Sequence, residues 1–569
     1  MRPSSIVIAT ALLAGTATAA THDVPGDFAT ITAAEAAAAD GDVIKIAKGT
    51  YAESVTTSLQ LTFVGQKGTI WDGFFGATDN AHLVATADNV KVKGIDFRHG
   101  LKPISITGDD ASVTDCIFRS CDTGVLIDGA RGNVSKNEFS GLENSSTDEW
   151  AVEILGPDSV VRDNEVTISY AFGVHVDAES GGTTTVEGNV FETNQYYGYI
   201  LVENAAAPMI KKNEMRNCYV EDSVIDVDNC DDAMVIGNVL THMNYYVYYC
   251  IDVDGDRATV SKNVLESLNC YSGDHYGIYV SGDDAKVEKN KISATGAGED
   301  YDTWGIYVSG ADASVKKNSI SHLGGGGDSI YGIEVSGDDA KVCQNDVRYL
   351  NDEETMGIVV GGDRAMVAKN DVSFVMVGAA IDVTGNDFRI LDNNLKNGSY
   401  DCYGIDASGS GTSPGSAEIK GNSVYNFVYT GIYSSGNDVD MSNNKVKTCA
   451  DDAFYISGDN NVLKNNSACK MWGDAFHING DNNTLTKCVA KDADKDGFDI
   501  NGIGNTLISC DAKNCAAEGL DNGGTSTGTN VRKCRFTGCR IDYAGDGAIN
   551  DDIKNKYGSG GPGTVPEID

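Results

Sequence analysis

One position recurs along most of this chain at intervals of 21 to 29 residues. An apolar residue stands three positions before it, and usually another stands two positions after it. Self-similarity at such a period is typical of a solenoid, in which each repeat is a coil that buries its apolar face against its neighbours. The members of this ladder are Cys116, Asn137, Asn164, Asn189, Asn213, Asn238, Asn263, Asn290, Asn318, Asn345, Asn370, Asn393, Asn422, Asn444, Asn466, Cys488, Cys510 and Cys534.

The coil that begins at Tyr276 shows the pattern most clearly, in the stretch "YGIYVSGDDAKVEKNKI". Apolar residues alternate with polar ones in three short runs, which turns of Gly, Asp and Asn separate. Such runs are typical of short β-strands, so we expect three strands per coil and parallel stacking of the coils. Counting the coil of Ile95, which fills the same frame, the ladder has nineteen members. At about 4.8 Å per step this is a rod of roughly 86 Å.

The asparagines of the ladder are interpreted as scaffold. Asn tolerates the left-handed backbone of a tight bend, and its amide can bond to the same amide in the coils above and below. Cys488, Cys510 and Cys534 replace Asn in consecutive coils. Two interpretations stay open for them: small buried residues, or a disulfide between neighbouring strands. The chain has 15 cysteines, an odd number, so at least one is unpaired or joined to another molecule.

Charge and segment composition limit the partners and the location. The net charge of -40 argues against nucleic acid and anionic membranes, and leaves cations and neutral ligands. Residues 1–20 have the layout of a secretory signal peptide, and no later segment is apolar for long enough to span a bilayer. We therefore expect a secreted protein, extracellular or periplasmic. Its parts would be a cap with a helix over 32–39 in residues 21–80, a β-helix over 81–552 and a flexible tail over 553–569.

The run "GDFATITAAEAAAADGDVIKIAKGTYAESV" followed by the coils resembles the start of right-handed parallel β-helix proteins of the pectate-lyase-like superfamily, which includes NosD-like repeat proteins. The resemblance covers Val24 to about Asp552. It implies an all-β, right-handed parallel β-helix with a capped N-terminus, and an active cleft on the outer face of the first strand of each coil, which is "GIYV" in the coil quoted above. The Gln-Asp and Arg-Pro-Trp motifs of the esterases, the Gly-His-Gly of polygalacturonases and the Asp-Pro-His-Asp of alginate epimerases are not visible, so no specific activity follows.

Alternation along that strand separates inward from outward residues. Aligning the coils gives an outward column of His175, Leu201, Asp226, Asp252, Tyr279, Tyr307, Glu334, Val359, Asp382, Asp406, Tyr433, Tyr455, His477, Asp499 and Asp521. Asp177, Glu203, Asp228 and Asp254 stand beside it. Carboxylates about 5 Å apart repel one another, which raises their pKa values or recruits a cation. This patch is the candidate site.

Aromatic residues surround the patch and favour sugar binding, because rings stack on apolar sugar faces while acids bond to hydroxyls. We expect segments that overhang the patch to carry Tyr197, Tyr199, Tyr246, Tyr249, His275, Tyr276 and Trp304, with Tyr279 and Tyr307 on the strands.

Two mechanisms fit these residues. In the first, Asp226 and Asp252 act as the acid and the base or nucleophile of a glycosidase, with His175 close by. In the second, which the resemblance suggests, Asp177, Glu203, Asp228 and Asp254 hold Ca²⁺ that bridges a uronate before elimination. That route needs a basic residue, and the nearest is Arg257 in the next turn. Hydrolysis ranks above elimination.

The acids also have purely structural interpretations. Asp is common in turns, and an acid-rich surface can serve solubility alone. A second cluster, Asp452, Asp474, Asp496 and Glu518, recurs every 22 residues, with Tyr455, His477, Asp499 and Asp521 three positions further on in each coil. It indicates coil duplication or a cation ladder. The "GDD" turns at 108–110, 282–284 and 337–339 are turn residues that could collect Ca²⁺ along one edge.

Two functions therefore compete. The first is a secreted, monomeric protein that binds and processes a polysaccharide or a cell-surface glycan, with Ca²⁺ as the one candidate cofactor. The second is a non-catalytic surface, matrix or adhesion rod that binds glycans or cations.

Overall fold

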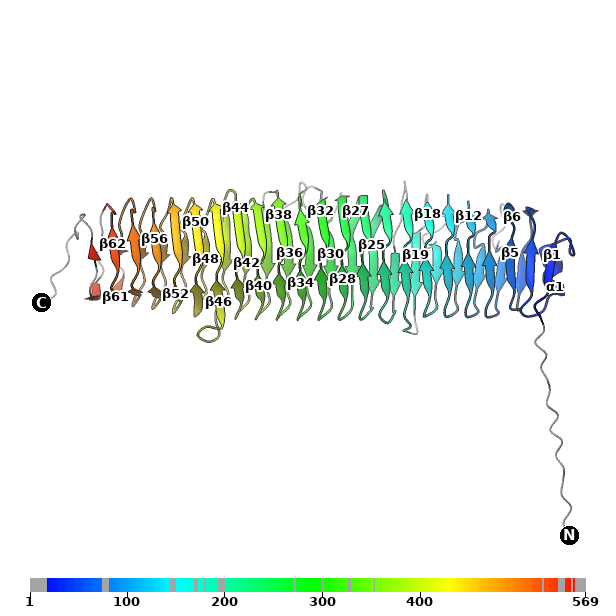
Figure 1. Ribbon diagram of the computed structural model, residues 1–569, viewed down its shortest axis with the longest axis horizontal. Coiled ribbons are helices and arrows are strands. Elements are labelled where there is room, and N and C mark those ends of the chain that lie inside the picture. Colours follow the sequence, from blue (N-terminus) through cyan, green and yellow to red (C-terminus); the bar gives the residue numbers. More distant parts are fainter. Residues whose placement is uncertain are drawn as a thin grey trace, which may run out of the picture.

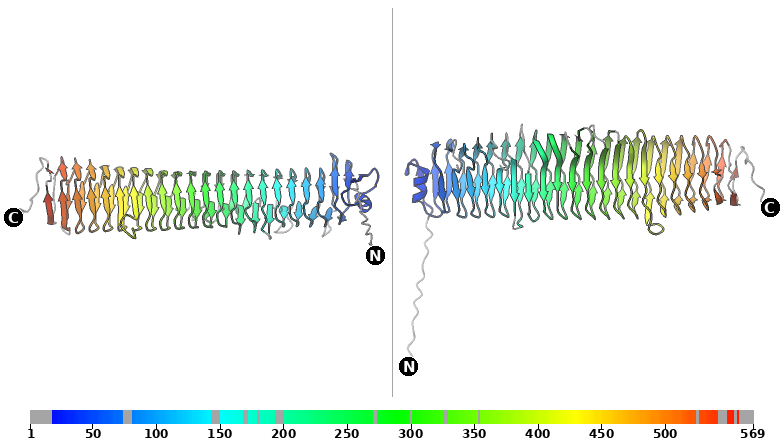
Figure 2. Two further views of the ribbon diagram at one scale, coloured as in Figure 1. Left: turned by 60° about the horizontal axis from the view of Figure 1, so that its bottom comes forward. Right: turned by 180° about the vertical axis from the view of Figure 1, so that it is seen from behind.

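The computed structural model describes residues 18–73, 81–142, 150–167, 172–178, 181–192, 200–269, 273–298, 301–324, 329–352, 354–523, 526–540, 548–553 and 556–557. These residues form a long rod of stacked coils, with the N-terminal coils at one end and the C-terminal coils at the other (Figures 1 and 2). Most of the predicted signal peptide and of the predicted tail lies outside the described residues.

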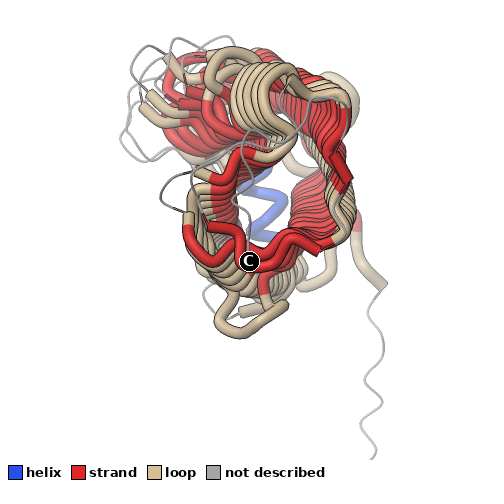
Figure 3. Tube along the Cα trace, turned by 90° about the vertical axis from the view of Figure 1, so that its left-hand side faces the viewer, coloured by secondary structure: helices blue, strands red, loops and turns tan. Residues whose placement is uncertain are grey.

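Each regular coil has three strands, as the alternation predicted. In the coil of Asn290 they are β30 (His275–Val280), β31 (Lys286–Glu288) and β32 (Lys291–Gly296). Each strand pairs in parallel and in register with the matching strand of the next coil, so that Ile278 faces Ile306 and Tyr279 faces Tyr307. The strands build three walls, named here the first-strand, second-strand and third-strand sheets after the order within a coil. Seen end-on, the walls enclose one continuous core (Figure 3).

The coil count agrees with the ladder. The second-strand sheet has 23 described strands, and nineteen of these, from β8 (Lys91–Lys93) to β61 (Thr527–Arg532), precede the ladder positions from Ile95 to Cys534. Inward side chains of neighbouring coils stack on one another. The rings of Phe454 and Phe476 are 4.7 Å apart and nearly parallel, and Phe498 continues the stack. Repetition of one apolar residue at each inward position therefore fills the core.

Buried side-chain amides connect the coils. Asn263 Nδ2 donates to Asn290 Oδ1 at 3.1 Å and to Val235 O at 2.9 Å, and the backbone N–H of Asn263 donates to the same Oδ1 at 3.0 Å. Equivalent bonds recur along the asparagine ladder, which confirms the predicted amide-to-amide contact. The predicted left-handed backbone at Asn was wrong. The residue before it is left-handed instead, as at Lys262 (φ 58) and Lys289 (φ 59), because the ladder Asn must already point inward.

The cap contains the predicted short helix. Helix α1 (Ile31–Ala37) buries Ile31 and Ala34 against the first coil, and in the end-on view of the backbone it lies across the end of the ring that the three walls form (Figure 3). Its first backbone N–H groups donate to the Glu53 carboxylate, with Ile31 N at 2.8 Å and Thr32 N at 2.9 Å. The helix therefore closes the apolar end of the solenoid. No described helix has the length and apolarity that a membrane span requires.

The ladder cysteines are buried thiols in the structure. Cys488 and Cys510 are free, and the backbone N–H of Cys510 donates to Cys534 Sγ at 3.4 Å. The sulfur thus occupies the place of the Asn oxygen. This supports the interpretation of small buried residues that replace Asn.

Candidate functional site

Strand register brings the predicted outward column together on the first-strand sheet. Asp226 on β25 (Tyr219–Asp228) pairs with Leu201 on β22 (Ile200–Glu203) on one side, and with Asp252 on β27 (Val239–Val253) on the other. Asp252 pairs in turn with Tyr279, and Tyr279 with Tyr307 on β33 (Thr303–Val308). Two carboxylates therefore stand side by side, with tyrosines continuing the column.

The two aspartates are half-buried and hold their protons unusually tightly. Burial, then the charges of Asp222, Asp228 and Glu203, raise the pKa of Asp226 to about 7. Burial and the charge of Asp226, with weaker effects of its neighbours, raise the pKa of Asp252 to about 7 as well. Near neutral pH the pair can therefore offer a carboxylic acid and a carboxylate at one place.

Asp222 belongs to this cluster, although the sequence alignment of coils did not include it. The register of β25 against β27 shifts between Asp222 and Ser223, and Asp222 has a left-handed φ of 93°. The extra residue is Tyr248 on β27, and on β25 the left-handed backbone of Asp222 re-aims its side chain. Strict alternation could not place Asp222, because a left-handed residue breaks the period of two.

His175 on β19 (Phe172–Asp177) lies apart from the aspartate pair. Leu201 separates it from Asp226 in the column, so two strand steps, about 10 Å, lie between them. His175 Nε2 is 2.9 Å from Glu203 Oε2, and Nδ1 is 3.8 Å from Glu153 Oε1. Burial disfavours the imidazolium, but the two glutamates outweigh burial and raise the pKa of His175. Glu153, on β16 (Trp150–Ile154), is the register neighbour that the predicted column left out.

The four carboxylates predicted to bind Ca²⁺ do not converge on one point in the described part of the chain. Glu203 contacts His175, Asn204 Nδ2 donates to Asp177 Oδ1 at 3.0 Å, and Ser281 Oγ donates to Asp254 Oδ1 at 2.6 Å. Asp228 follows Glu203 in register. Protein donors therefore serve three of the four predicted ligands.

The predicted aromatic residues lie mostly on strands, which corrects the expectation of overhanging segments. Tyr246 and Tyr249 are in β27, Tyr276 in β30 and Trp304 in β33, whereas Tyr197 and Tyr199 lie outside the described residues. The strands are longer here because the chain stays extended and pairs with its neighbours in adjacent coils. His275 is fully buried, and burial lowers its pKa to about 4, so it belongs to the core.

These rings stack on one another along the rod. Tyr276 lies 5.0 Å from Tyr249 and 4.5 Å from Trp304, and Trp304 lies 5.1 Å from Tyr331, all nearly parallel. Tyr331, on β36 (Ser329–Val335), extends the stack by a ring that the prediction omitted. Tyr279 and Tyr307 form a second stack at 5.3 Å. Because the faces cover one another, the stacks present ring edges and hydroxyl groups beside Asp252.

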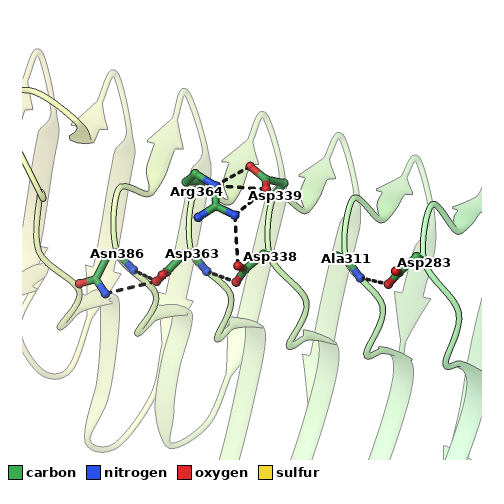
Figure 4. A network of polar contacts seen from close by, with 7 residues as sticks. All are labelled: Asp283, Ala311, Asp338, Asp339, Asp363, Arg364 and Asn386. Carbon is green, nitrogen blue, oxygen red and sulfur yellow. Dashed lines mark hydrogen bonds and ion pairs between the residues drawn. The ribbon is translucent and has the colours of Figure 1, made fainter.

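Arginine side chains do not reach the acidic patch in the described part of the chain. Arg257 Nε lies 2.9 Å from Asp232 Oδ1 and Arg257 Nη2 lies 3.1 Å from Asp231 Oδ2, in the neighbouring turn. Figure 4 shows the equivalent clamp of Arg364 on Asp338 and Asp339, where Asp338 also accepts the backbone N–H of Asp363. The "GDD" turns therefore form a ladder of their own that protein donors satisfy.

The second predicted cluster is compact. Asp452 and Asp474 are buried at the entrance to β51 (Phe454–Ile456) and β54 (Phe476–Ile478), and His477 projects outward from β54. His477 Nδ1 lies 3.0 Å from Asp452 Oδ2 and 3.8 Å from Asp474 Oδ2. Within the described residues this is the one group of three potential metal-ligand atoms within 4.8 Å of one another.

An exposed aromatic column on the third-strand side escaped the sequence analysis. The rings of His322 and Tyr349 are 4.8 Å apart, and those of Tyr349 and Phe374 are 4.6 Å apart. With Tyr400 they line an open groove of about 590 Å³. Each of the four residues has a left-handed φ, which is strained for a bulky side chain. Their constant position, four after the ladder residue for the first three, was the available signal.

Comparison with known proteins identifies the fold family. The model of the family described as "right handed beta helix region" matches residues 74–220 and 403–555, which together are more than half of the chain. The chain therefore belongs to the right-handed β-helix family, and the predicted architecture and its handedness are confirmed. No curated protein matches the chain.

Solved structures whose chains follow a similar path include two alginate lyases and a phage tailspike protein. The PL6 family alginate lyase AlyGC is 10% identical over 95% of this chain and 100% of its own, with a TM-score of 0.30. A complex of alginate lyase AlyF-OU02 is 12% identical over 65% of this chain and 83% of its own, with a TM-score of 0.35. The Dettilon tailspike protein is 16% identical over 85% and 69%, with a TM-score of 0.20. At these scores the likeness carries no argument about activity.

Proposed function

We propose that this protein binds a polysaccharide along the first-strand sheet and hydrolyses its glycosidic bonds with Asp226 and Asp252. The observation that carries this proposal is the pairing of the two half-buried carboxylates in register, each with a pKa of about 7. Groups with such pKa values can give and take protons at neutral pH, which is what acid and base catalysis require.

In the proposed reaction one aspartate is protonated and donates its proton to the glycosidic oxygen as the bond to the anomeric carbon breaks. The other is ionised and attacks the anomeric carbon, and water then releases the sugar. Neighbouring parallel strands are about 4.8 Å apart, and carboxyl groups of retaining glycosidases are about 5 to 5.5 Å apart. The arrangement therefore favours retention of configuration over inversion, which needs a wider separation.

Elimination is the weaker alternative. Removal of a proton next to a uronate carboxylate needs a base and a positive charge that stabilises the intermediate. In the described part of the chain no Lys or Arg forms an ion pair with Asp226 or Asp252, and Arg257 is engaged by Asp231 and Asp232. Residues 1–20 resemble a signal peptide and support secretion. We therefore place the glycan outside the cell, and the protein would bind it as a monomer.

The second candidate is a rod that binds glycans without cleaving them. The groove lined by His322, Tyr349, Phe374 and Tyr400 supports it, because the groove is open and these aromatic side chains are exposed to solvent. Tyr349 is 42% exposed, Phe374 is 41% exposed and Tyr400 is 64% exposed. Sugar rings stack on such surfaces.

A panel of neutral and acidic polysaccharides distinguishes the two functions. Purified protein is incubated with each glycan, and new reducing ends and unsaturated products are measured. Wild-type protein should release reducing ends without unsaturated products, and Asp226→Asn and Asp252→Asn should each lower the rate by about 10²- to 10⁴-fold. Unsaturated products would indicate elimination, and binding without any product would favour the second candidate.

Asp406→Asn is the matched control. Asp406 pairs in register with Asp382 further along the same column, and burial, with the charge of Asp382, raises its pKa to about 6. It is a second aspartate pair of the same construction, and Tyr433 adjoins it in register as Tyr279 adjoins Asp252. The difference lies in the neighbouring charges: Asp382 alone adds to the effect of burial on Asp406, whereas Asp226, Asp222, Asp254 and Asp228 add to it on Asp252. Replacement of Asp406 should leave the rate within about twofold of wild type. Equal losses in Asp252→Asn and Asp406→Asn would contradict a site at Asp226 and Asp252.

A further inference from the structure

In the cluster of Asp452, Asp474 and His477, two carboxylates face the same nitrogen of one imidazole, whereas the two glutamates beside His175 face different ring nitrogens. The two aspartate side chains are 5% and 6% exposed, and the His477 side chain is 21% exposed. Gly473 permits this close packing, since a Cβ there would stand 2.4 Å from Asp452 Oδ1. The carboxylates are therefore fixed inside, while the imidazole opens to the surface.

Hydrogen bonds orient the imidazole. His477 Nε2 lies 3.1 Å from Asn479 Oδ1, and Asn479 Nδ2 donates to the Tyr455 hydroxyl at 2.7 Å. With its NH₂ group used in this way, Asn479 presents its oxygen to the ring, and that oxygen can only accept. Nε2 must therefore carry a proton, and in neutral His477 the lone pair is on Nδ1, which faces the two aspartates. Ligating histidines are commonly oriented by such a second bond.

One oxygen in this cluster lacks a donor. Asp452 Oδ1 accepts the backbone N–H of Asp474, and Asp474 Oδ1 accepts that of Asp496, so each Oδ1 is satisfied. Asp452 Oδ2 has His477 Nδ1 at 3.0 Å, but Asp474 Oδ2 is 3.8 Å from the same nitrogen, too far for a hydrogen bond. No hydrogen bond to Asp474 Oδ2 is found within the described residues. Two carboxylate oxygens in fixed positions therefore face one imidazole nitrogen, and the three atoms lie within 4.8 Å of one another, close enough to share one cation.

We propose that Asp452 Oδ2, Asp474 Oδ2 and His477 Nδ1 bind one divalent transition-metal ion of the zinc type. Metal–ligand bonds of 2.0 to 2.2 Å in a tetrahedron place neighbouring ligand atoms about 3.3 Å apart. The observed separations from His477 Nδ1, 3.0 and 3.8 Å, lie on either side of this value. Three protein ligands leave the fourth position for water on the exposed side of the ring.

The ligand set excludes calcium as the preferred ion. Ca²⁺ takes six to eight oxygen ligands, whereas imidazole nitrogen with carboxylates suits Zn²⁺ and its first-row neighbours. Burial raises the pKa values of Asp474 and Asp499, and the charge of Lys495 opposes part of this rise. Lys495 is therefore the competing positive charge, yet it forms no ion pair with either aspartate within the described residues. The site is independent of the proposed hydrolysis at Asp226 and Asp252.

Metal titration of untagged full-length protein tests the proposal. The protein is stripped with a chelator and dialysed, and Zn²⁺ and Ca²⁺ are titrated separately by calorimetry, followed by elemental analysis after gel filtration. We expect about one Zn²⁺ per chain in wild-type protein and no comparable binding of Ca²⁺. Asp474→Asn and His477→Gln should each lower Zn²⁺ affinity by at least about tenfold, and Co²⁺-loaded wild-type protein should show visible absorption that His477→Gln lacks.

Asp481→Asn is the control in the same coil. Asp481 Oδ1 accepts the backbone N–H of Ile503, and Asn386 and Asn437 fill the same turn position in other coils, so Asn is compatible with the fold there. This variant should bind Zn²⁺ as wild type does. Asp474→Asn keeps the Oδ1 that accepts from Asp496, and circular dichroism establishes that it is folded. Wild-type affinity in Asp474→Asn, or the absence of stoichiometric Zn²⁺ in wild-type protein, would overturn the proposal.

Discussion

The aspartate pair near the middle of the rod and the cluster near its C-terminal end lie on the same sheet but balance their charges differently. Around Asp226 and Asp252 the nearest charged groups are further carboxylates, and burial adds to their repulsion. In the far cluster Asp452 and Asp474 accept backbone N–H groups and face His477. A parallel β-helix brings like residues together in any case, so the partner of each acid, and not the proximity of acids, indicates what a cluster can do.

The largest expected difference between the two regions is in catalysis. Asp252→Asn should lower the rate of glycan hydrolysis by about 10²- to 10⁴-fold, whereas Asp474→Asn should change it by less than about twofold, because the far cluster is a separate site. Initial rates on the same polysaccharide decide between them. Loss of activity only in Asp474→Asn would move the catalytic site to the far cluster.

The second difference is in how much Asp452 contributes to the free energy of unfolding. Asp452→Asn removes the negative charge that faces His477 Nδ1. Depending on the orientation of the new amide, either its NH₂ group or its uncharged oxygen faces the imidazole. We expect the free energy of unfolding to fall by about 2 to 3 kcal/mol at pH 5.5, since breaking a buried pair leaves its partner uncompensated. Denaturant unfolding monitored by circular dichroism measures the change.

The pH dependence of that loss has a definite sign. Burial lowers the pKa of His477, but Asp452, Asp499 and Asp474 outweigh burial and raise it. The pair therefore stabilises the fold below the unfolded pKa of about 6.5, and its contribution disappears as the pH rises through the folded value. Destabilisation by Asp452→Asn that stays constant from pH 5.5 to 9 would show that His477 does not carry the charge.

The third difference is the effect of replacing Asp252, which should stabilise the fold, whereas replacing Asp452 should destabilise it. The folded pKa of Asp252, about 7, lies above the ordinary value of 3.8, so the native state binds more protons between these values and its stability falls as the pH rises from 4 to 7. Asp252→Asn should raise the free energy of unfolding by about 2 kcal/mol at pH 8.5, half the full linkage value because the group is partly solvated, and by little at pH 4. Unfolding midpoints at the two pH values give the sign directly.

The sequence predicted what strict repetition determines. The ladder defined the phase of each coil, and in-register pairing then placed Asp226 beside Asp252 and Tyr279 beside Tyr307 as expected. The far cluster was also found, because its spacing of 22 residues is constant.

Local departures from the repeat could not be read in this way. Asp222 has a left-handed backbone opposite a bulge in β27, and β27 runs as one strand where a loop was expected. The orientation of His477 depends on Asn479, two residues along, which repetition alone does not connect to it. Hydrogen bonds between a residue and its near neighbours in three dimensions decide these features, and no period in the sequence encodes them.

The smallest expected effect lies on the exposed aromatic column of the third-strand side. Phe374 has a φ of 60° in a bend where Asn397 and Asn426 stand in the following coils with similar backbone. Phe374→Asn relieves about 1 kcal/mol of strain and loses a ring stack worth about 0.5 to 1.5 kcal/mol, so the free energy of unfolding should change by less than about 1 kcal/mol.

If the groove binds glycan, the affinity of Phe374→Asn for the glycan should be about five- to tenfold lower than that of wild type in calorimetry or a retardation gel. Val462→Ser removes an equally exposed apolar side chain from another face and should leave binding unchanged. Equal binding by Phe374→Asn and wild type would remove the evidence for a non-catalytic glycan rod, and would leave the aspartate pair as the surface to which a polysaccharide binds.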